Sequence, residues 1–454
     1  MQMQETLHRS LRSEIERNMR ENGYTISKTA EISGINPGTL SDILNSNPPR
    51  AITIHHLDSL ARAFGQPEGW LYDLYPEECL AEGKISRPRL IPYLIRCAEV
   101  GCQDCLELAV SQLLENPKHL SILYNVAERL YEEGKHKEAR PFYEYVVENE
   151  KDSFSDQFII SQYRLFRLSI GTNSDENWKA VIRFEIYRKR LPENYQLDAL
   201  LQVARVYYAL HKWSFVEKFA DELRELSLLV YKDNLRRRKK NRENEFFKTE
   251  RHLVVYYGQG FLLKGVALIM REKYEEAKKY VAAYANLSWF EDLDELGVEE
   301  VNKFHYWGKA NLYALNITMG NLETLTDYVQ FLEKNPHEIM TGLLTIMKAA
   351  NKYDLNVDGI LDGFSEYMVR VEDYKHAIDL SKIFRLREQK YEYDFRKGRI
   401  SQGIDELLHC LDLSLIIHNH KGFKRCVTLF WKFFTHASNE QRKRYQMILE
   451  REDE

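Results

Sequence analysis

Residues 25–46 read Thr-Ile-Ser-Lys-Thr-Ala-Glu-Ile-Ser-Gly-Ile-Asn-Pro-Gly-Thr-Leu-Ser-Asp-Ile-Leu-Asn-Ser. This stretch predicts two short helices that cross at a tight turn. Ala30 is the small residue that a close crossing requires, and Gly34 permits a left-handed turn. Leu40 and Ile43 give the second helix an apolar face toward the first. The spacing of these residues is typical of a unit that reads DNA.

The residues around this stretch extend the pattern. Asn36 can cap the second helix, and Pro37 at its first position loses nothing, because that N–H would be unpaired anyway. Turn signals divide the first 75 residues into five predicted helices. These helices span residues 5–21, 27–33, 37–44, 53–64 and 68–74. Their order, with the trailing segment 57–65, resembles the Cro and phage-repressor-like helix-turn-helix family.

This resemblance implies that the helix starting at Pro37 enters the major groove of double-stranded DNA. Thr39 and Ser41 would contact bases or phosphates, and the flanking polar residues would position the backbone. The predicted DNA-binding residues are Lys28, Asn36, Pro37, Thr39, Ser41, Asn45 and Arg50. The alternative is that the helix-turn-helix serves as a dimerisation or protein-docking unit.

The charge of this module bears on its affinity for DNA. Residues 1–75 hold seven Lys and Arg against nine Asp and Glu, so the module is not basic. The predicted reading helix contains no Arg, Lys or Gln, the side chains that make most of the strongest bidentate contacts with bases. Specific binding would therefore need two modules, which predicts a homodimer.

Composition predicts an all-α protein. The 454 residues include only 11 Pro and 21 Gly, and no sustained alternating strand pattern occurs. The N-terminus has no apolar signal-peptide run, and Gln259 and Lys264 interrupt the apolar stretch 252–270. We therefore expect a cytoplasmic protein with no membrane association. Its six cysteines are expected to stay reduced, mostly as small core residues.

From about Arg87 onward the pattern changes to helix pairs with a period of roughly 34 residues, as in tetratricopeptide repeats. Such an array predicts a right-handed superhelix with an extended concave face. The predicted domains are a helix-turn-helix domain at 1–75, a linker at 76–86 and a repeat domain at 87–454. A charged insertion at 232–251, with the basic run 236–240, is expected to form a long exposed helix or a mobile loop.

The two halves together resemble the peptide-pheromone receptors of Gram-positive bacteria and their phages, the Rap, Rgg, NprR, PlcR and PrgX group (RRNPP). This resemblance implies a short signalling peptide in the concave groove, a homodimer formed through the repeats, and quorum-sensing control of DNA binding. It implies no cofactor. A bound peptide needs amides for its backbone, a cation for its carboxylate and aromatic walls. The predicted peptide-binding residues are Tyr124, Asn125, Glu128, Gln162, Arg164, Gln202, Arg205, Tyr208, Tyr256, Gln259 and Asn311.

The remaining motifs do not predict catalysis. Cys97, Cys102 and Cys105 have a spacing seen in some iron–sulfur sites, but buried thiols are the better interpretation, so no metal site is predicted. A redox sensor stays an open alternative. The chain contains no H-E-x-x-H motif, Walker loop, nucleotide fingerprint or nucleophile elbow, and its histidines lack carboxylates at ligand spacing. We therefore do not predict an enzyme.

The leading hypothesis is a cytoplasmic, homodimeric transcription regulator whose repeats sense a short peptide. One alternative is a protein-binding adaptor, in which the repeats capture a signalling protein. Another is a Rap-like protein that promotes dephosphorylation of a response regulator, which would require a water-positioning amide or carboxylate near the N-terminal helices. The sequence does not show whether the peptide activates or represses the regulator.

Overall fold

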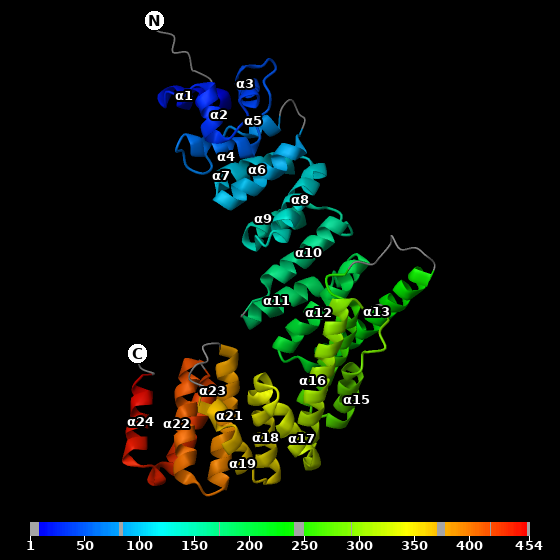
Figure 1. The fold of residues 1–454 in the computed structure, drawn as a ribbon, viewed down its shortest axis with the longest axis vertical. Helices are drawn as coiled ribbons and strands as arrows, with labels where there is room; N and C mark the ends of the chain where they lie inside the picture. Colours follow the sequence, from blue (N-terminus) through cyan, green and yellow to red (C-terminus); the bar gives the residue numbers. More distant parts are fainter. Residues whose placement is uncertain are drawn as a thin grey trace. The chain divides into compact units, whose positions relative to one another are not determined.

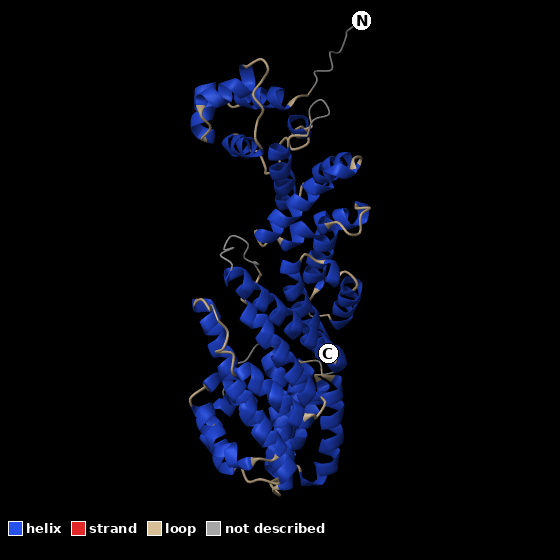
Figure 2. Cartoon of the chain, turned by 90° about the vertical axis from the view of Figure 1, so that its right-hand side faces the viewer, coloured by secondary structure: helices blue, strands red, loops and turns tan. Residues whose placement is uncertain are grey.

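A computed structural model describes residues 9–80, 85–171, 173–239, 249–291, 293–369, 377–417 and 419–451. Within these ranges all regular secondary structure is helical, which confirms the predicted all-α class (Figures 1 and 2). The described chain forms two compact units. Unit 1 holds the described residues up to Leu210 together with Thr249 and Glu250. Unit 2 holds those from His211 to Lys239 and from Arg251 onward.

Unit 1 begins with four helices whose ends follow their capping residues. They are α1 (Leu11–Glu21), α2 (Ile26–Ser33), α3 (Pro37–Asn45) and α4 (Ile54–Ala63). Ser10 caps α1 in a reciprocal capping box, and Thr25 and Thr53 cap α2 and α4. The predicted first helix therefore starts too early at residues 9 and 10, and its residues 5–8 lie outside the described part. The next three predicted helices agree with the structure to within one residue at each end.

The predicted fifth helix at 68–74 is wrong. This segment forms a series of turns, and a single helical turn, α5 (Pro76–Cys79), follows it. Gly69 and Leu71 have φ of 83° and 59°, a left-handed backbone that a right-handed helix cannot include. The side chain of Leu71 is only 4% exposed, because the turns place it in the hydrophobic core.

The rest of unit 1 consists of successive helices that pack side by side, each pair joined by a short loop (Figure 1). They are α6 (Arg87–Val100), α7 (Gln103–Leu114), α8 (Leu120–Glu132), α9 (His136–Asn149), α10 (Asp156–Ser169), α11 (Ser174–Glu185) and α12 (Glu193–Ala209). The short 3-10 helices η2 (Pro117–His119) and η3 (Arg188–Arg190) lie in two of the loops. One hydrophobic core runs without a break from Leu11 to Val146. The helix-turn-helix thus shares its core with the first helix pairs, and the predicted linker at 76–86 stays a prediction.

Unit 2 continues the pattern of paired helices. They are α13 (Trp213–Lys239), α14 (Leu253–Met270), α15 (Tyr274–Ala285), α16 (Glu295–Met319), α17 (Leu325–Glu333), α18 (Ile339–Tyr353), α19 (Asp358–Gly363), α20 (Ser365–Val369), α21 (Ala377–Arg396), α22 (Ile400–Ile416), α23 (His420–Phe433) and α24 (Asn439–Glu450). Three further 3-10 turns lie between them at 322–324, 336–338 and 434–436. The predicted insertion at 232–251 is helical as far as Lys239, as part of α13, and its residues 240–248 lie outside the described part.

Helix α14 is the most apolar helix of unit 2 and packs against α13, α15 and α16. By length and composition it could cross a membrane, but 56% of its apolar window is buried inside the protein. A Cβ atom on Gly258 would lie 2.5 Å from the ring of Phe304 on α16, so only glycine allows this close approach. Burial against its neighbours accounts for the apolar composition of α14.

Unit 2 also contains a histidine that stays neutral in the folded state. Burial, together with Arg387 and Arg444, lowers the pKa of His409 to about 4. Its Nδ1 accepts a hydrogen bond from Arg444 at 2.9 Å. An unfolded histidine has a pKa of about 6.5 and so binds a proton first as the pH falls. The stability that depends on neutral His409 is therefore present above pH 6.5 and is lost as the pH falls toward 4.

We expect His409→Gln to remove part of the acid sensitivity of unit 2. Between pH 7 and 4 the parent should lose about 2 kcal/mol more unfolding free energy than the variant, a value reduced because the ring is partly exposed. Urea unfolding at four pH values measures the difference. Parallel pH profiles for parent and variant would show that His409 does not titrate between the folded and unfolded states.

Candidate nucleic-acid interface and polar network

The crossing of α2 and α3 has the geometry that the sequence predicts. Gly34 ends α2 with a φ of 71°, and Ala30 is 2% exposed where the helices meet. Leu40 and Ile43 on α3 are fully buried in the same core. The side-chain oxygen of Asn36 accepts hydrogen bonds from the first free N–H groups of α3, at 2.9 and 3.3 Å. The apolar side of α3 is buried in the core of unit 1. Its opposite side is therefore available to a partner.

Of the predicted DNA-binding residues, Asn36 caps α3, Pro37, Thr39, Ser41 and Asn45 belong to it, Lys28 lies on α2, and Arg50 follows α3. Thr39 and Ser41 are half-buried, and the other five are exposed. Because Asn36 uses its carbonyl oxygen as a cap, it cannot also pair with adenine through both of its polar atoms. Thr39 and Ser41 are the residues of α3 that carry hydroxyl groups, and their contact with bases stays a prediction.

Two of the predicted phosphate contacts are already paired with carboxylates. Lys28 lies 3.0 Å from Glu31, and Arg50 lies 3.7 Å from Asp42. Both pairs are exposed, and such pairs stabilise a protein by only about 0–1 kcal/mol, so a phosphate can replace the carboxylate. Residues 1–75 nevertheless hold more acidic than basic side chains, which limits their non-specific affinity for DNA.

A clamp that the sequence analysis missed holds the loop after α3. The guanidinium of Arg12 on α1 donates hydrogen bonds to the carbonyl oxygens of Ile43 and Arg50, at 2.9 and 3.1 Å. It also donates to Glu78 on α5 at 2.7 Å, and Glu78 accepts the N–H of Ile52 at 3.2 Å. The position of Arg12 on a half-buried helix face gave no signal of these distant partners.

A chain of ion pairs leads from the helix-turn-helix into the helix pairs of unit 1. Asp58 on α4 accepts a hydrogen bond from Arg96 on α6 at 2.9 Å, and Arg96 donates to Glu99 at 2.6 Å. Glu99 in turn pairs with Lys135, which precedes α9. Burial opposes the charge on Glu99, but the hydrogen bonds from Lys135 and Arg96 outweigh it and lower its pKa. Ion pairs, as well as the shared hydrophobic core, therefore connect the helix-turn-helix to the helix pairs of unit 1.

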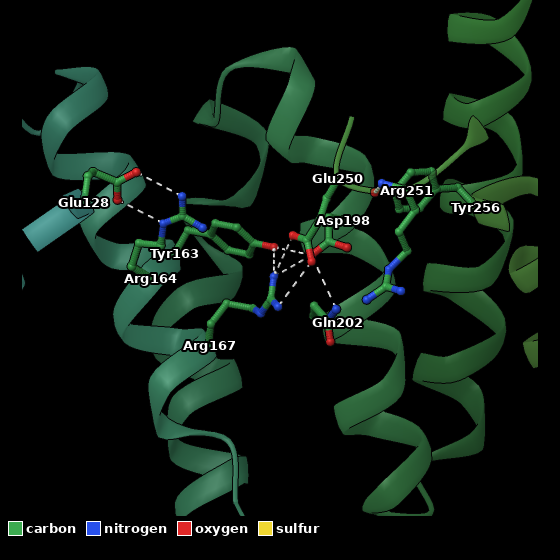
Figure 3. A network of polar contacts seen from close by, with 9 residues as sticks. All are labelled: Glu128, Tyr163, Arg164, Arg167, Asp198, Gln202, Glu250, Arg251 and Tyr256. Atoms are coloured by element: carbon green, nitrogen blue, oxygen red, sulfur yellow. Dashed lines mark hydrogen bonds and ion pairs between the residues drawn. The ribbon is translucent and has the colours of Figure 1, made fainter. Parts of the chain in front are cut away.

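Helices α8, α10 and α12 carry a polar network on the faces that they turn toward one another (Figure 3). Its first part joins two predicted peptide-binding residues, Glu128 and Arg164. The guanidinium of Arg164 donates to both carboxylate oxygens of Glu128, at 3.0 and 2.9 Å, and lies 4.1 Å from the ring centroid of Tyr131. Burial opposes the charge on Arg164, but Glu128 outweighs it and raises the pKa of Arg164.

The second part of the network centres on Asp198 of α12, which is 1% exposed. Its carboxylate accepts hydrogen bonds from Tyr163 at 2.5 Å, Arg167 at 2.8 Å and Gln202 at 3.3 Å (Figure 3). Arg167 also contacts Glu250, with N–O distances of 3.0 and 3.4 Å. Burial and Asp198 raise the pKa of the Tyr163 hydroxyl. Of these five residues only Gln202 belongs to the predicted peptide-binding set.

The remaining predicted peptide-binding residues are divided between the two units. Near the network in unit 1, Asn125 and Tyr208 are exposed, whereas Tyr124 and Arg205 are half-buried. In unit 2, Tyr256 is fully buried and its hydroxyl accepts the N–H of Arg251 at 3.1 Å (Figure 3). Gln259 and Asn311 are half-buried, and Asn311 donates to Tyr284 at 2.7 Å.

The side chains of Gln162 and Arg164 point in different directions, although the two residues are only two positions apart on α10. Gln162 lines a cavity of 480 Å³ among α9, α10 and α11, with Arg140, Glu144 and Arg183 nearby. Residues two apart on a helix point in nearly opposite directions. The structure therefore places Gln162 away from the polar network.

The cysteines of the predicted spacing lie close together without a metal arrangement. Cys97 is buried, and Cys102 and Cys105 are half-buried with their sulfur atoms 2.7 Å apart. Burial, with Cys102 beside it, raises the pKa of Cys105 to about 12. Among the described residues no group of three or more His, Cys, Asp or Glu side chains is arranged to hold a metal ion.

Comparison with known proteins agrees with the geometry of the N-terminal module. Residues 15–71 match the helix-turn-helix family model. No curated protein matches the chain. One similar solved structure is described as a circular tandem repeat protein with novel repeat topology and enhanced subunit contact surfaces. It is 13% identical, covers 98% of this chain and 90% of that chain, and has a TM-score of 0.14, too low to define a common fold.

The crossing of α2 and α3 and the family match define the class of protein. The chain is a DNA-binding transcription regulator with an N-terminal helix-turn-helix domain of the Cro and phage-repressor type. This confirms the predicted N-terminal module. The tetratricopeptide repeats and the pheromone-receptor group stay predictions.

Proposed function

We propose that this chain is a cytoplasmic, homodimeric transcription regulator in which a short signalling peptide, bound on α8, α10 and α12, controls DNA binding by α3. The observation that carries the proposal is the shared core of unit 1. The helix-turn-helix and the first helix pairs are packed into one hydrophobic cluster, so a change in the helix pairs can reach the module.

The proposed peptide site uses the polar faces of these three helices. Asn125 offers an exposed amide for a peptide backbone, and Tyr124 and Tyr208 offer aromatic surface. Arg164 and Arg167 supply cations, each held in a fixed direction by a carboxylate. Fixed donors cost little conformational entropy when a ligand binds, which favours recognition of a short flexible peptide.

A selection experiment tests the DNA-binding part of the proposal. The full chain is incubated with random DNA duplexes, and bound duplexes are recovered and sequenced over several rounds. The parent should enrich one motif, with two half-sites if it binds as a dimer. The double variant Thr39→Ala, Ser41→Ala should enrich it less, because it loses the only base-contacting hydroxyls of α3. Equal enrichment by parent and variant would remove α3 as the reading helix.

A further inference from the structure

Arg167 contacts two carboxylates that differ sharply in their surroundings. Asp198 belongs to helix α12 and its side chain is 2% exposed, whereas the side chain of Glu250 is 42% exposed. Asp198 also accepts hydrogen bonds from Tyr163 and Gln202. One carboxylate is thus part of the core, and the other lies at the surface.

Asp198 both neutralises and orients Arg167. Its contact at 2.8 Å and the Tyr163 hydroxyl at 3.1 Å both involve the same guanidinium nitrogen, Nη1. Nη1 has only two N–H groups, so a second carboxylate at the outer edge must share them and also reach the N–H groups of Nη2. Glu250 lies at that edge, with one oxygen 3.0 Å from Nη1 and the other 3.4 Å from Nη2. Because Asp198 already balances the charge, Glu250 is not needed for neutrality.

Glu250, which contacts the outer edge of Arg167, does not belong to any of the helix pairs of unit 1. It is 83 residues from Arg167 in sequence and lies in the segment that precedes α14. The side chain of Arg167 is 21% exposed and that of Glu250 is 42% exposed, so water competes for Glu250 more readily than for Arg167. Asp198 therefore orients Arg167 from the core, and Glu250 occupies the outer edge of the guanidinium from the more exposed side (Figure 3).

We propose that the outer edge of Arg167 binds a carboxylate of the peptide ligand, and that Glu250 occupies this place until the ligand displaces it. This inference rests on the proposed peptide-sensing function and names the chemistry of its ligand. The carboxylate is either the peptide C-terminus or an Asp or Glu side chain. Glu250 then sets a threshold, since the ligand must compete with an internal carboxylate before it can bind.

Three pools of random synthetic hexapeptides test the proposal on the immobilised full-length chain. The first pool has a free C-terminal carboxylate and no Asp or Glu. The second is C-terminally amidated and has one Asp or Glu per peptide, and the third is amidated with neither. Retained peptides are quantified by mass spectrometry for the parent, for Glu250→Gln and for Glu144→Gln. Glu144→Gln is the matched control, because it removes the carboxylate of another exposed ion pair, with Arg140 on α9.

Glu250→Gln should retain about ten-fold more of the first or second pool, relative to the third, if Glu250 occupies Arg167 nine-tenths of the time. A gain in the first pool identifies a C-terminal carboxylate, and a gain in the second an acidic side chain. Glu144→Gln should behave as the parent. Adding Arg167→Gln to Glu250→Gln should abolish the gain, and Arg167→Lys should keep part of it. If Arg167→Gln does not fold, the comparison of the two glutamate variants still decides.

Two results would overturn the proposal in distinguishable ways. If the parent retains peptides but Glu250→Gln shows no gain, or gains all three pools equally, Glu250 does not compete for a carboxylate site, while peptide sensing stands. If no variant retains any pool, the proposed peptide sensing fails and this inference fails with it.

Discussion

Replacing Thr39 with glutamate should weaken binding to the selected duplex by roughly 30- to 150-fold, or about 2–3 kcal/mol. The reason is that the new carboxylate would face the bases and phosphates from the first turn of α3. The helix itself should tolerate the change, because an acidic side chain is favourable near a helix N-terminus and Thr39 lies outside the buried core. Fluorescence anisotropy with a labelled duplex, at two salt concentrations, measures the loss.

The matched control for this variant is Ser111→Glu. Ser111 is exposed on α7 of the same unit, so the substitution makes the same change in net charge away from α3. Its affinity should stay within about two-fold of the parent, since charges beyond a Debye length of about 10 Å are screened. Equal losses in both variants would mean that net charge, and not the position of α3, sets DNA affinity.

Replacing Asp198 with alanine should destabilise the α10–α12 part of unit 1 by about 3–5 kcal/mol. The substitution leaves the Arg167 guanidinium without its buried counter-charge and the Tyr163 hydroxyl without its acceptor. Hydrogen exchange of the amides in α10 and α12 measures this loss, because it reports the opening of one region in a chain with two compact units.

Two further variants separate the roles of charge and hydrogen bonding at Asp198. Asp198→Asn keeps an acceptor for Tyr163 and should lose less stability than the alanine variant. Glu176→Gln removes the carboxylate of the exposed pair with Lys179 on α11 and should leave exchange unchanged. If Asp198→Ala exchanges at the rate of the parent, the network does not stabilise these helices.

The fold of the first four helices could be predicted because its signals are local. Caps such as Thr25 and Asn36 and the turn at Gly34 act within a few residues of where they stand. The segment 68–74 was predicted wrongly for a related reason. Its apolar spacing suits a helix, but contacts with the core outweigh that preference and hold Leu71 in a left-handed conformation.

The polar network could be predicted only in part, because its partners are far apart in sequence. Helical spacing selects Glu128, Arg164 and Gln202 as polar positions, but it cannot show that Glu128 and Arg164 pair with each other. It also grouped Gln162 with Arg164, although Gln162 lines a cavity and Arg164 pairs with Glu128. Nothing in the sequence near Glu250 indicates a contact 83 residues away.

We propose that two binding events are coupled within unit 1. One is ligand binding on α8, α10 and α12, and the other is DNA binding by α3. Thermodynamic linkage requires that each ligand changes the affinity of the other by the same factor. The most direct test is therefore to measure hexapeptide retention by the full chain, using the pool that it binds. Retention is compared with and without a saturating amount of the selected duplex. If the two sites are coupled, the duplex should change peptide retention about five-fold or more in either direction. Equal retention in the presence and absence of duplex would contradict it.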